Sequence, residues 1–270
     1  MARAIFFPRR PGLRGALPEL SAAWRGHRVA GTRLTDFFEL TGLEGNPLWP
    51  LLYPQAAGFR LLMTILTDRR FPFPIWGALQ VRNRLVLHQP IVRGDILEFE
   101  ARIAGARALA KGTEIDLACT VRRAGKLVWE SLNAFYYRGT RSALPPSPEP
   151  PEAPVVEGAP VADWTASGEG RARFGRVTGD YNGIHLSDWY ARLFGFRGAF
   201  HHPQRMLGEA LAHTPRAMRD LPVRLETWLK GPVYYGAKVA LRTSADRSEF
   251  ALFVEGDERP AILGRLNTGS

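Results

Sequence analysis

The chain has 270 residues, 45% of them hydrophobic and 23% charged, which is enough apolar material for a buried core and excludes wholesale disorder. Its 36 Lys and Arg residues exceed its 26 Asp and Glu residues, a net charge of +10, but they are scattered, and no basic stripe indicates a nucleic-acid partner. The chain has one cysteine, which excludes an internal disulfide, and no Cys/His cluster with zinc-ligand spacing, which excludes a zinc module. It has no apolar run of about 18 residues, which excludes a membrane span.

The first residues of the chain are rich in arginine and contain no acidic residue before Glu19. Their apolar stretch ends before Pro8 and is too short for the core of a secretory signal. The arginines are typical of a mitochondrial presequence, but Pro8 and Pro11 interrupt the amphipathic helix that such a presequence forms. We therefore expect the protein in the cytoplasm.

A strongly apolar stretch at residues 54–67 predicts a helix that is buried on nearly all sides. Pro54 is expected in its first turn, where the missing N–H of a proline costs no hydrogen bond. A helix with apolar residues all round needs a curved sheet that wraps around it.

Alternating apolar and polar residues follow this helix and predict half-buried antiparallel strands. Residues 98–103 form one such strand and residues 114–122 the next, in which Glu114 and Asp116 are expected to face solvent. Residues 126–137 add a further strand.

Residues 141–154 hold six prolines, a composition typical of an extended connector that packs poorly. We therefore divide the chain into a first repeat at residues 1–140, a linker at residues 141–155 and a second repeat at residues 156–270.

The second half repeats the order of the first. His-Pro-Gln at residues 202–204 leads into an apolar helix as Tyr-Pro-Gln does at residues 53–55, an offset of 149. This offset is larger than that of the matching strand residues given below, and we assign the extra residues of the first half to the loop at residues 69–74. Two diverged copies of one unit, each a long helix followed by antiparallel strands, explain this α+β pattern. The matching strand residues, at a constant offset of 142, are Leu87, Pro90 and Gly94 against Leu229, Pro232 and Gly236, and further strands are expected at residues 234–243, 248–255 and 260–266.

The densest group of chemically useful side chains lies in the second copy, between residues 179 and 186. Gly179 and Gly183 flank Asp180 and Asn182, which favours a tight turn that carries the carboxylate toward His185.

Ser187 is placed to cap a short helix over residues 188–194, with Gly195 as its stop. His185 is therefore expected on a loop just before a helix. An imidazole and a carboxylate that converge on one water molecule can activate it as general base and return a proton as general acid. The alternative is that Asp180 only closes an Asx turn and that His185 is a surface residue beside the cap.

The eight residues 179–186, Gly-Asp-Tyr-Asn-Gly-Ile-His-Leu, resemble the signature Gly-Asp-x-Asn-Pro-x-His of the MaoC-like, (R)-specific enoyl-thioester hydratases and dehydratases. Residues 190–196 and His202, at the start of the following helix, are similar to the family as well. The resemblance covers roughly residues 30–265, but only the signature is specific.

This resemblance implies a double hot-dog fold, in which each repeat wraps an antiparallel sheet round a long central helix and only one repeat carries the signature. The implied reaction is the reversible syn hydration of a trans-2-enoyl thioester to the (R)-3-hydroxyacyl thioester. Coenzyme A or acyl carrier protein would carry the substrate, and no other cofactor and no metal is implied. The implied catalytic residues are Asp180 and His185, and the implied substrate-binding residues are Gly179, Asn182, His202 and Gln204.

Two residues depart from the family pattern. Pro203 stands where the family has the glycine whose N–H stabilises the developing enolate, and proline has no N–H. Losing such a donor costs about 3 kcal/mol of transition-state stabilisation, so either the amide of Gln204 replaces it or activity is weak or lost. Gly183 in place of the signature's proline is expected to matter less, at about 1 kcal/mol.

The departure at Pro203 keeps a second hypothesis open, a non-catalytic acyl-thioester-binding or partner subunit with the same fold; a hot-dog thioesterase is a weaker third. Arg205, Arg224 and Lys230 are candidates for binding the phosphates of coenzyme A or an acidic carrier protein. Two fused copies already form the paired unit of such a fold, so a monomer is sufficient, and a homodimer is the open alternative.

Overall fold

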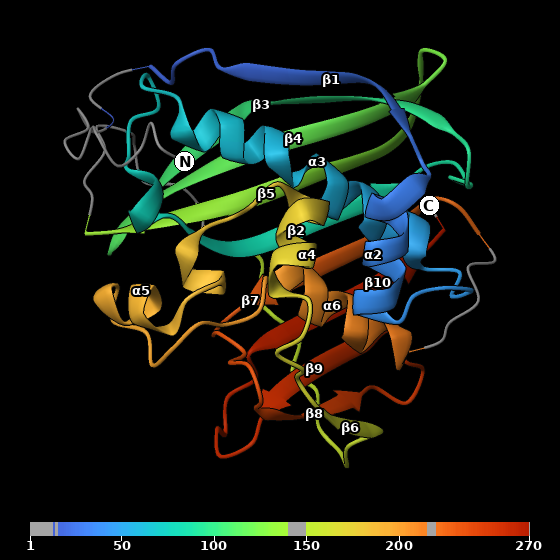
Figure 1. Cartoon of the computed structure of the whole chain (residues 1–270), viewed down its shortest axis with the longest axis vertical. Coiled ribbons are helices and arrows are strands. Elements are labelled where there is room, and N and C mark those ends of the chain that lie inside the picture. The colour runs from blue at the N-terminus through green and yellow to red at the C-terminus, as the bar shows by residue number, and fades with distance from the viewer. Residues whose placement is uncertain (1–12, 14–15, 140–149, 215–219, 270) are drawn as a thin grey trace.

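A computed structural model describes residue 13 and residues 16–139, 150–214 and 220–269 of the chain. In this part of the chain ten strands form one antiparallel sheet (Figure 1). In chain order the strands are β1 (Ser21–Arg28), β2 (Leu79–Leu87), β3 (Ile96–Leu109), β4 (Gly112–Arg123), β5 (Lys126–Arg138), β6 (Ala162–Thr165), β7 (Val223–Leu229), β8 (Lys238–Thr243), β9 (Glu249–Val254) and β10 (Ile262–Thr268).

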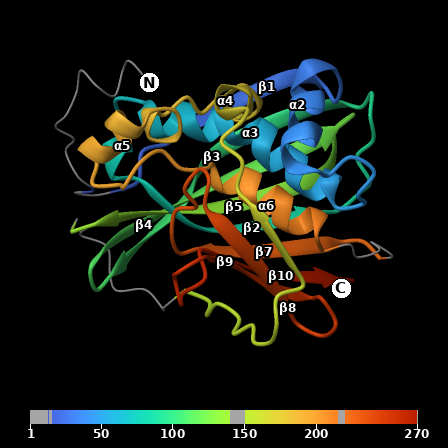
Figure 2. The same ribbon diagram turned by 60° about the horizontal axis from the view of Figure 1, so that its bottom comes forward.

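The order of strands across the sheet is β1-β3-β4-β5-β2-β7-β10-β9-β8-β6, so the strands of each half of the chain stay together. The halves join where β2 pairs with β7, in a register that sets Leu85 opposite Leu225. The helices cover one face of the curved sheet, and the α+β class predicted from the sequence is confirmed (Figure 2).

The helices described are α2 (Gly31–Thr41), α3 (Trp49–Thr67), α4 (Arg171–Thr178), α5 (Asp188–Leu193) and α6 (Pro203–Ala212), with single 3-10 turns η1 (Ile75–Gly77) and η2 (Gly183–His185). Helix α3 is the long buried helix of the first half, and α6 is its shorter counterpart in the second. Both contribute to one continuous apolar core under the sheet.

The prediction that Pro54 opens the first helix is wrong, because α3 already begins at Trp49 and encloses Pro54. Pro50 occupies the first turn instead, where its missing N–H costs nothing. Pro54 follows one turn later and removes a hydrogen bond to the carbonyl of Pro50, which the burial of the helix on almost every side offsets. Helix α6, by contrast, begins at Pro203 as the sequence predicts.

Positions that the sequence matches between the halves have the same place in the fold. Leu87 ends β2 and Leu229 ends β7. Gly94 and Gly236 both lie in turns with positive φ, at 92° and 80°, a conformation that favours glycine. The predicted strand at residues 234–243 is shorter than expected and begins at Lys238, because the residues before it form the turn that contains Gly236.

The alternation in β3 is as predicted, but the outward-facing carboxylates of β4 are buried. Glu114 accepts a hydrogen bond from Arg82 at 2.6 Å, and Asp116 accepts one from Arg107. The prediction that these acids face solvent is wrong because arginines on the neighbouring strands β2 and β3 cover them.

Residues 141–149 of the predicted linker lie outside the described residues, and the exact boundaries of the two repeats stay a prediction. From Pro150 the linker lies against the sheet of the second half. Val156 packs in a small cluster with Trp228, whose indole N–H donates to the carbonyl of Pro151 at 2.9 Å. No helix in the described segments is long and apolar enough to cross a membrane.

Candidate active site

The turn that follows α4 carries the acidic residue of the candidate site. The helix ends at Thr178, and Gly179 adopts a left-handed conformation with φ of 74° while donating its N–H to Gly175. A side chain at this position would also clash with its surroundings, because a Cβ would lie 2.7 Å from the Cβ of Arg60. Gly179 therefore shapes the turn, and nothing places it against a substrate.

Local hydrogen bonds fix the signature loop. Asp180 accepts the N–H of Asn182 on Oδ1 at 3.0 Å, which is the Asx turn that the sequence suggests. Asn182 in turn accepts the N–H of Ile184 on its side-chain oxygen at 3.3 Å, so it supports the loop, as its place in the signature implies. The N–H of His185 donates to the carbonyl of Asn182 at 2.9 Å and completes η2.

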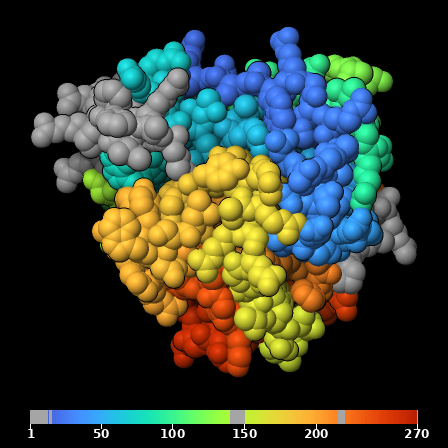
Figure 3. Space-filling view, in the orientation of Figure 1, coloured from blue at the N-terminus to red at the C-terminus, as the bar shows by residue number. Residues whose placement is uncertain are grey.

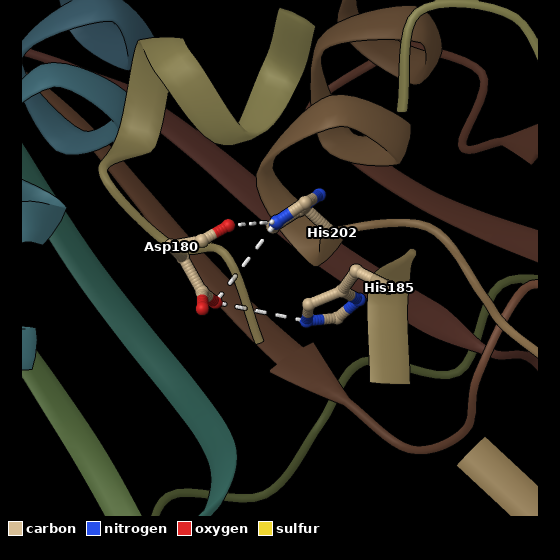
Figure 4. Close-up of side chains that lie close together, drawn as sticks. All are labelled: Asp180, His185 and His202. Atoms are coloured by element: carbon tan, nitrogen blue, oxygen red, sulfur yellow. Dashed lines mark hydrogen bonds and ion pairs between the residues drawn. The ribbon is translucent and has the colours of Figure 1, made fainter. Parts of the chain in front are cut away.

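Asp180 and His185 are brought together in the interior. The Nε2 atom of His185 lies 3.7 Å from Oδ2 of Asp180 (Figure 4), and the residues are only 5% and 6% exposed, so the interpretation of His185 as a surface residue is wrong. The Nδ1–H of His185 donates to the carbonyl of Phe200 at 2.9 Å. Because a carbonyl only accepts, a neutral His185 keeps its lone pair on Nε2, the atom that faces the carboxylate.

His202, at the start of α6, completes the cluster. Its Nε2–H donates to the backbone carbonyl of Asp180 at 2.9 Å, and the same nitrogen lies 4.0 Å from Oδ2 of that residue (Figure 4). Its ring stacks on that of His185 with centroids 4.0 Å apart. His202 thus holds the turn and the neighbouring imidazole at once.

Burial keeps both imidazoles neutral. It lowers the pKa of His185, although the Asp180 carboxylate and the Phe200 carbonyl act in the opposite direction. The pKa of His202 is lowered well below its usual value, by burial first and by the neighbouring His185 second. At neutral pH the cluster therefore contains two uncharged rings beside a carboxyl group.

Asp180, His185 and His202 are also close enough to be tested as metal ligands, since one potential ligand atom from each lies within 4.8 Å of the others. A ligating nitrogen must offer a lone pair, but Nε2 of His202 holds its proton in the hydrogen bond to Asp180. The arrangement therefore fits hydrogen bonding better than metal binding.

A cavity of about 300 Å³ runs from this cluster across the junction of the two halves. Its polar end contains Asp180, His185 and Gln204 from the second half. Its apolar wall comes from both halves; the first half contributes Phe59, Met63, Leu66, Ile75 and Phe135. The half without the signature thus supplies much of the space beside the cluster.

The start of α6 forms another part of the cavity wall. Pro203 is the first residue of the helix, and the N–H groups of Arg205 and Met206 donate to the carbonyl of His202. The N–H of Gln204 lies within the first turn, where helix geometry provides no partner from the helix itself. Pro203 and Gln204 both line the cavity, so the Gln204 amide is a candidate for the donor that proline lacks.

An amide network that begins at this wall was not predicted from the sequence. The side chain of Gln204 contacts that of Gln80 at 3.4 Å, and Gln80 bonds Asn133 at 3.1 Å. Asn133 also accepts a hydrogen bond from Gln55 at 2.6 Å. The sequence does contain a signal for this network, because Gln55 and Gln204 directly follow the two matched prolines, Pro54 and Pro203.

The short helix α5 confirms the predicted cap at Ser187, whose hydroxyl accepts the N–H of Tyr190 at 3.4 Å. The expectation that Gly183 in place of the signature's proline costs little stays a prediction. A Cβ on Gly183 would lie 2.5 Å from the ring of Tyr190, so this ring occupies the space that the signature's proline would need.

The three phosphate-binding candidates have different surroundings in the structure. Arg205 is buried and bonds Glu209 at 3.1 Å and the carbonyl of Glu169 at 2.5 Å, so it is not available to a phosphate. Lys230 lies on the cavity wall, whereas Arg224 is not among the lining residues.

Comparison with known proteins supports the family resemblance. No protein-family model matches the sequence. The chain is 28% identical over 204 residues to 3-hydroxyacyl-thioester dehydratase X of Mycobacterium tuberculosis, covering 75% of this chain and 72% of that protein.

Solved structures have the same fold. The crystal structure of that protein, HtdX, superposes with a TM-score of 0.76 at 22% identity, covering 93% of this chain and 100% of HtdX. A MaoC-like dehydratase from Phytophthora capsici gives 0.75 at 17% identity, with 94% and 96% covered. A conserved hypothetical protein of M. tuberculosis with a double hotdog fold gives 0.57 at 15% identity, with 93% and 96% covered. These likenesses show that the chain has the double hot-dog fold, and its signature loop resembles that of the MaoC-like hydratases and dehydratases.

Proposed function

We propose that the protein catalyses the reversible dehydration of (R)-3-hydroxyacyl thioesters to trans-2-enoyl thioesters. The observation that carries the proposal is the 3.7 Å separation of Oδ2 of Asp180 and Nε2 of His185 on the wall of a largely apolar cavity. Both atoms are hydrogen-bond acceptors when Asp180 is ionised and His185 is neutral. A pair of acceptors at this separation suits a water molecule that donates one O–H to each, or a substrate hydroxyl that donates to one of them.

In the hydration direction the water oxygen forms a bond to C3 of the enoyl group while one of its O–H bonds breaks. The pair takes up that proton and delivers a proton to C2 from the same side, which gives syn addition. In dehydration the C2 proton leaves to the pair and the C3 hydroxyl departs as water. Asp180 and His185 share these proton transfers as one coupled unit.

The negative charge that develops on the thioester oxygen needs a fixed donor. The N–H of Gln204 meets this need, since it lies in the first turn of α6, where the helix dipole also favours negative charge. His202 holds the backbone of Asp180 through its hydrogen bond and contributes to catalysis by positioning that residue.

Two further features support an acyl thioester as substrate. The apolar wall suits an acyl chain, and Lys230 on the same cavity suits the phosphates of a coenzyme A or carrier-protein arm. The relative from M. tuberculosis is named a 3-hydroxyacyl-thioester dehydratase, which favours this reaction class. Neither metal nor cofactor enters the proposed chemistry, and the cytoplasmic location expected from the sequence is part of the proposal.

Pro203 favours a second candidate, a subunit that binds acyl thioesters without turning them over, because it removes one backbone donor from the start of α6. Such a subunit would bind an acyl-CoA saturably and release no product.

Both candidates are tested by adding purified protein to trans-2-enoyl-CoA of short, medium and long chain length and following the absorbance of the conjugated thioester. We expect the absorbance to fall, with the (R)-3-hydroxyacyl thioester as product by chiral chromatography. Saturable binding with no absorbance change at any chain length would support the binding subunit instead.

A further inference from the structure

Arg60, on α3 of the first half, reaches across to the helix that precedes the signature loop. Its Nη2 donates to the carbonyl oxygens of Arg176 at 3.2 Å and Val177 at 3.0 Å, while its Nε donates to the carbonyl of Ala57 at 3.0 Å. The surface of α4 packs directly against α2 and α3 at this point (Figure 3).

The bonds from Arg60 complete the C-terminus of α4. The last carbonyls of a helix have no partner within it. In α4 the carbonyl of Gly175 accepts the N–H of Gly179 at 2.7 Å, and that of Phe174 accepts the hydroxyl of Thr178 at 3.2 Å. The two carbonyls that follow Gly175 are the ones that Arg60 takes, and its positive charge also suits the negative end of the helix.

The same side chain limits where the turn after α4 can lie. An added Cβ on Gly179 would lie 2.7 Å from the Cβ of Arg60, so the glycine backbone rests on the arginine. The next residue is Asp180, whose carboxylate must stay 3.7 Å from His185. A shift of α4 or of this turn therefore changes the separation on which the proposed chemistry depends.

Arg60 is itself held in place by the first half. Its guanidinium lies over the ring of Trp24 on β1, 4.8 Å from the centroid, and Arg33 lies 5.0 Å from the same centroid. Trp24 stacks in turn on Phe99 of β3 at 5.6 Å. The support runs from the sheet of one half to the catalytic loop of the other.

We propose that Arg60 is a positioning residue for the Asp180–His185 pair, and that the half without the signature acts on the chemistry through it. The inference rests on the proposed dehydratase function for its kinetic test, and a second measurement tests it without that function.

The kinetic test compares Arg60→Ala with wild type. A displacement of about 1 Å at a reacting group can lower the rate about a hundredfold, so we expect kcat to fall by about tenfold to a hundredfold. KM should change by no more than roughly twofold, because Arg60 is not among the residues that line the cavity. Arg60→Lys should recover part of the loss, since an ammonium can donate to one of the two carbonyls.

Arg173→Ala is the matched control. Arg173 bonds Asp36 at 2.8 Å across the same junction of α2 and α4 but does not hold the carbonyls at the end of α4. We expect its kcat to stay close to that of wild type. Equal losses in the two variants, or an unchanged kcat in Arg60→Ala, would overturn the inference while leaving the proposed function intact.

The second measurement is amide hydrogen exchange over residues 176–186 in the full-length protein. Arg60→Ala should accelerate exchange in this segment and Arg173→Ala should not, whether or not the protein has turnover. Unchanged exchange in Arg60→Ala would count against the positioning role, whereas a wild-type protein without turnover would count only against the proposed function.

Discussion

The imidazole of His202 stacks on that of His185 with ring centroids 4.0 Å apart, while its Nε2–H donates to the carbonyl of Asp180. One ring therefore orients both members of the proposed catalytic pair. The Nε2–H of His202 is engaged in a hydrogen bond to a backbone oxygen. His202 therefore supports the pair through ring packing and this one hydrogen bond, and it transfers no proton itself.

His202→Ala is accordingly predicted to weaken turnover without abolishing it. The buried carbonyl of Asp180 loses its donor, a loss of about 1–3 kcal/mol, and kcat should fall roughly tenfold to a hundredfold. His202→Asn, which keeps an N–H donor, should retain more activity than His202→Ala. Steady-state kinetics on both variants checks the order, and a complete loss in His202→Asn would point to direct proton transfer by His202.

The pH dependence of activity should be shallow around neutrality. Burial lowers the pKa of His185, so the ring remains neutral, with a lone pair on Nε2, throughout the neutral range. The acidic limb of the kcat profile should therefore appear below the usual histidine range. An acidic limb centred at or above the ordinary histidine pKa would show that a charged His185 is present at neutral pH.

Stability should decline on the acidic side because of a different histidine. Burial lowers the pKa of His27 to about 4, so the unfolded chain takes up its proton at a higher pH than the folded chain. The stabilisation is complete above the unfolded pKa of about 6.5 and is lost as the pH falls toward 4, by up to about 3 kcal/mol. Urea unfolding between pH 8 and pH 4 measures the loss.

His27→Gln is the control for this prediction. The amide can keep a hydrogen bond to the hydroxyl of Tyr53, which lies 2.9 Å from His27, but it does not titrate. The variant should lose less stability than wild type between pH 8 and pH 4. Identical pH slopes for the two proteins would contradict the assignment to His27.

Gly183→Ala tests the packing beneath the signature loop. Its Cβ would lie 2.5 Å from the Tyr190 ring, and such overpacking typically costs about 1–3 kcal/mol. The free energy of unfolding should fall by that amount, and the loss should be smaller when the same change is made in a Tyr190→Ala background. Additive effects in this double-mutant cycle would mean that the ring does not restrict position 183.

Substitution of Met63 tests the acyl site. Met63 lies on the apolar wall contributed by the first half, so Met63→Trp should fill part of the cavity. We expect kcat/KM to fall for long enoyl chains and to change little for the four-carbon substrate. A uniform loss across chain lengths would show that the acyl chain does not pass Met63.

Much of the local structure could be predicted from the sequence because its causes lie close together in the chain. The cap at Ser187 and the turn at Gly179 depend on neighbours within a few residues. The alternation in β3 likewise reports burial directly, since one face of the strand is covered. The signature's resemblance to a known family predicted the fold, which is confirmed, and the reaction class, which stays a proposal.

The remaining features depend on residues far apart in sequence. Glu114 is buried because Arg82 covers it, and Arg60 meets the carbonyl of Val177 across 117 residues of chain. Neither the pattern of one strand nor that of one helix contains this information. Helix α3 began earlier than predicted because two prolines, Pro50 and Pro54, compete for the first turn and only tertiary burial decides between them.

The central claim is that Asp180 and His185 transfer the protons of the reaction, and it is tested most directly by enoyl-CoA hydration with Asp180→Asn and His185→Gln. Both changes preserve approximate side-chain size, and circular dichroism and acyl-CoA binding verify that fold and cavity persist. We predict that each variant loses at least about a hundredfold in kcat, a typical contribution of a general acid or base. Turnover at the wild-type rate in either variant, with the fold intact, would contradict the account.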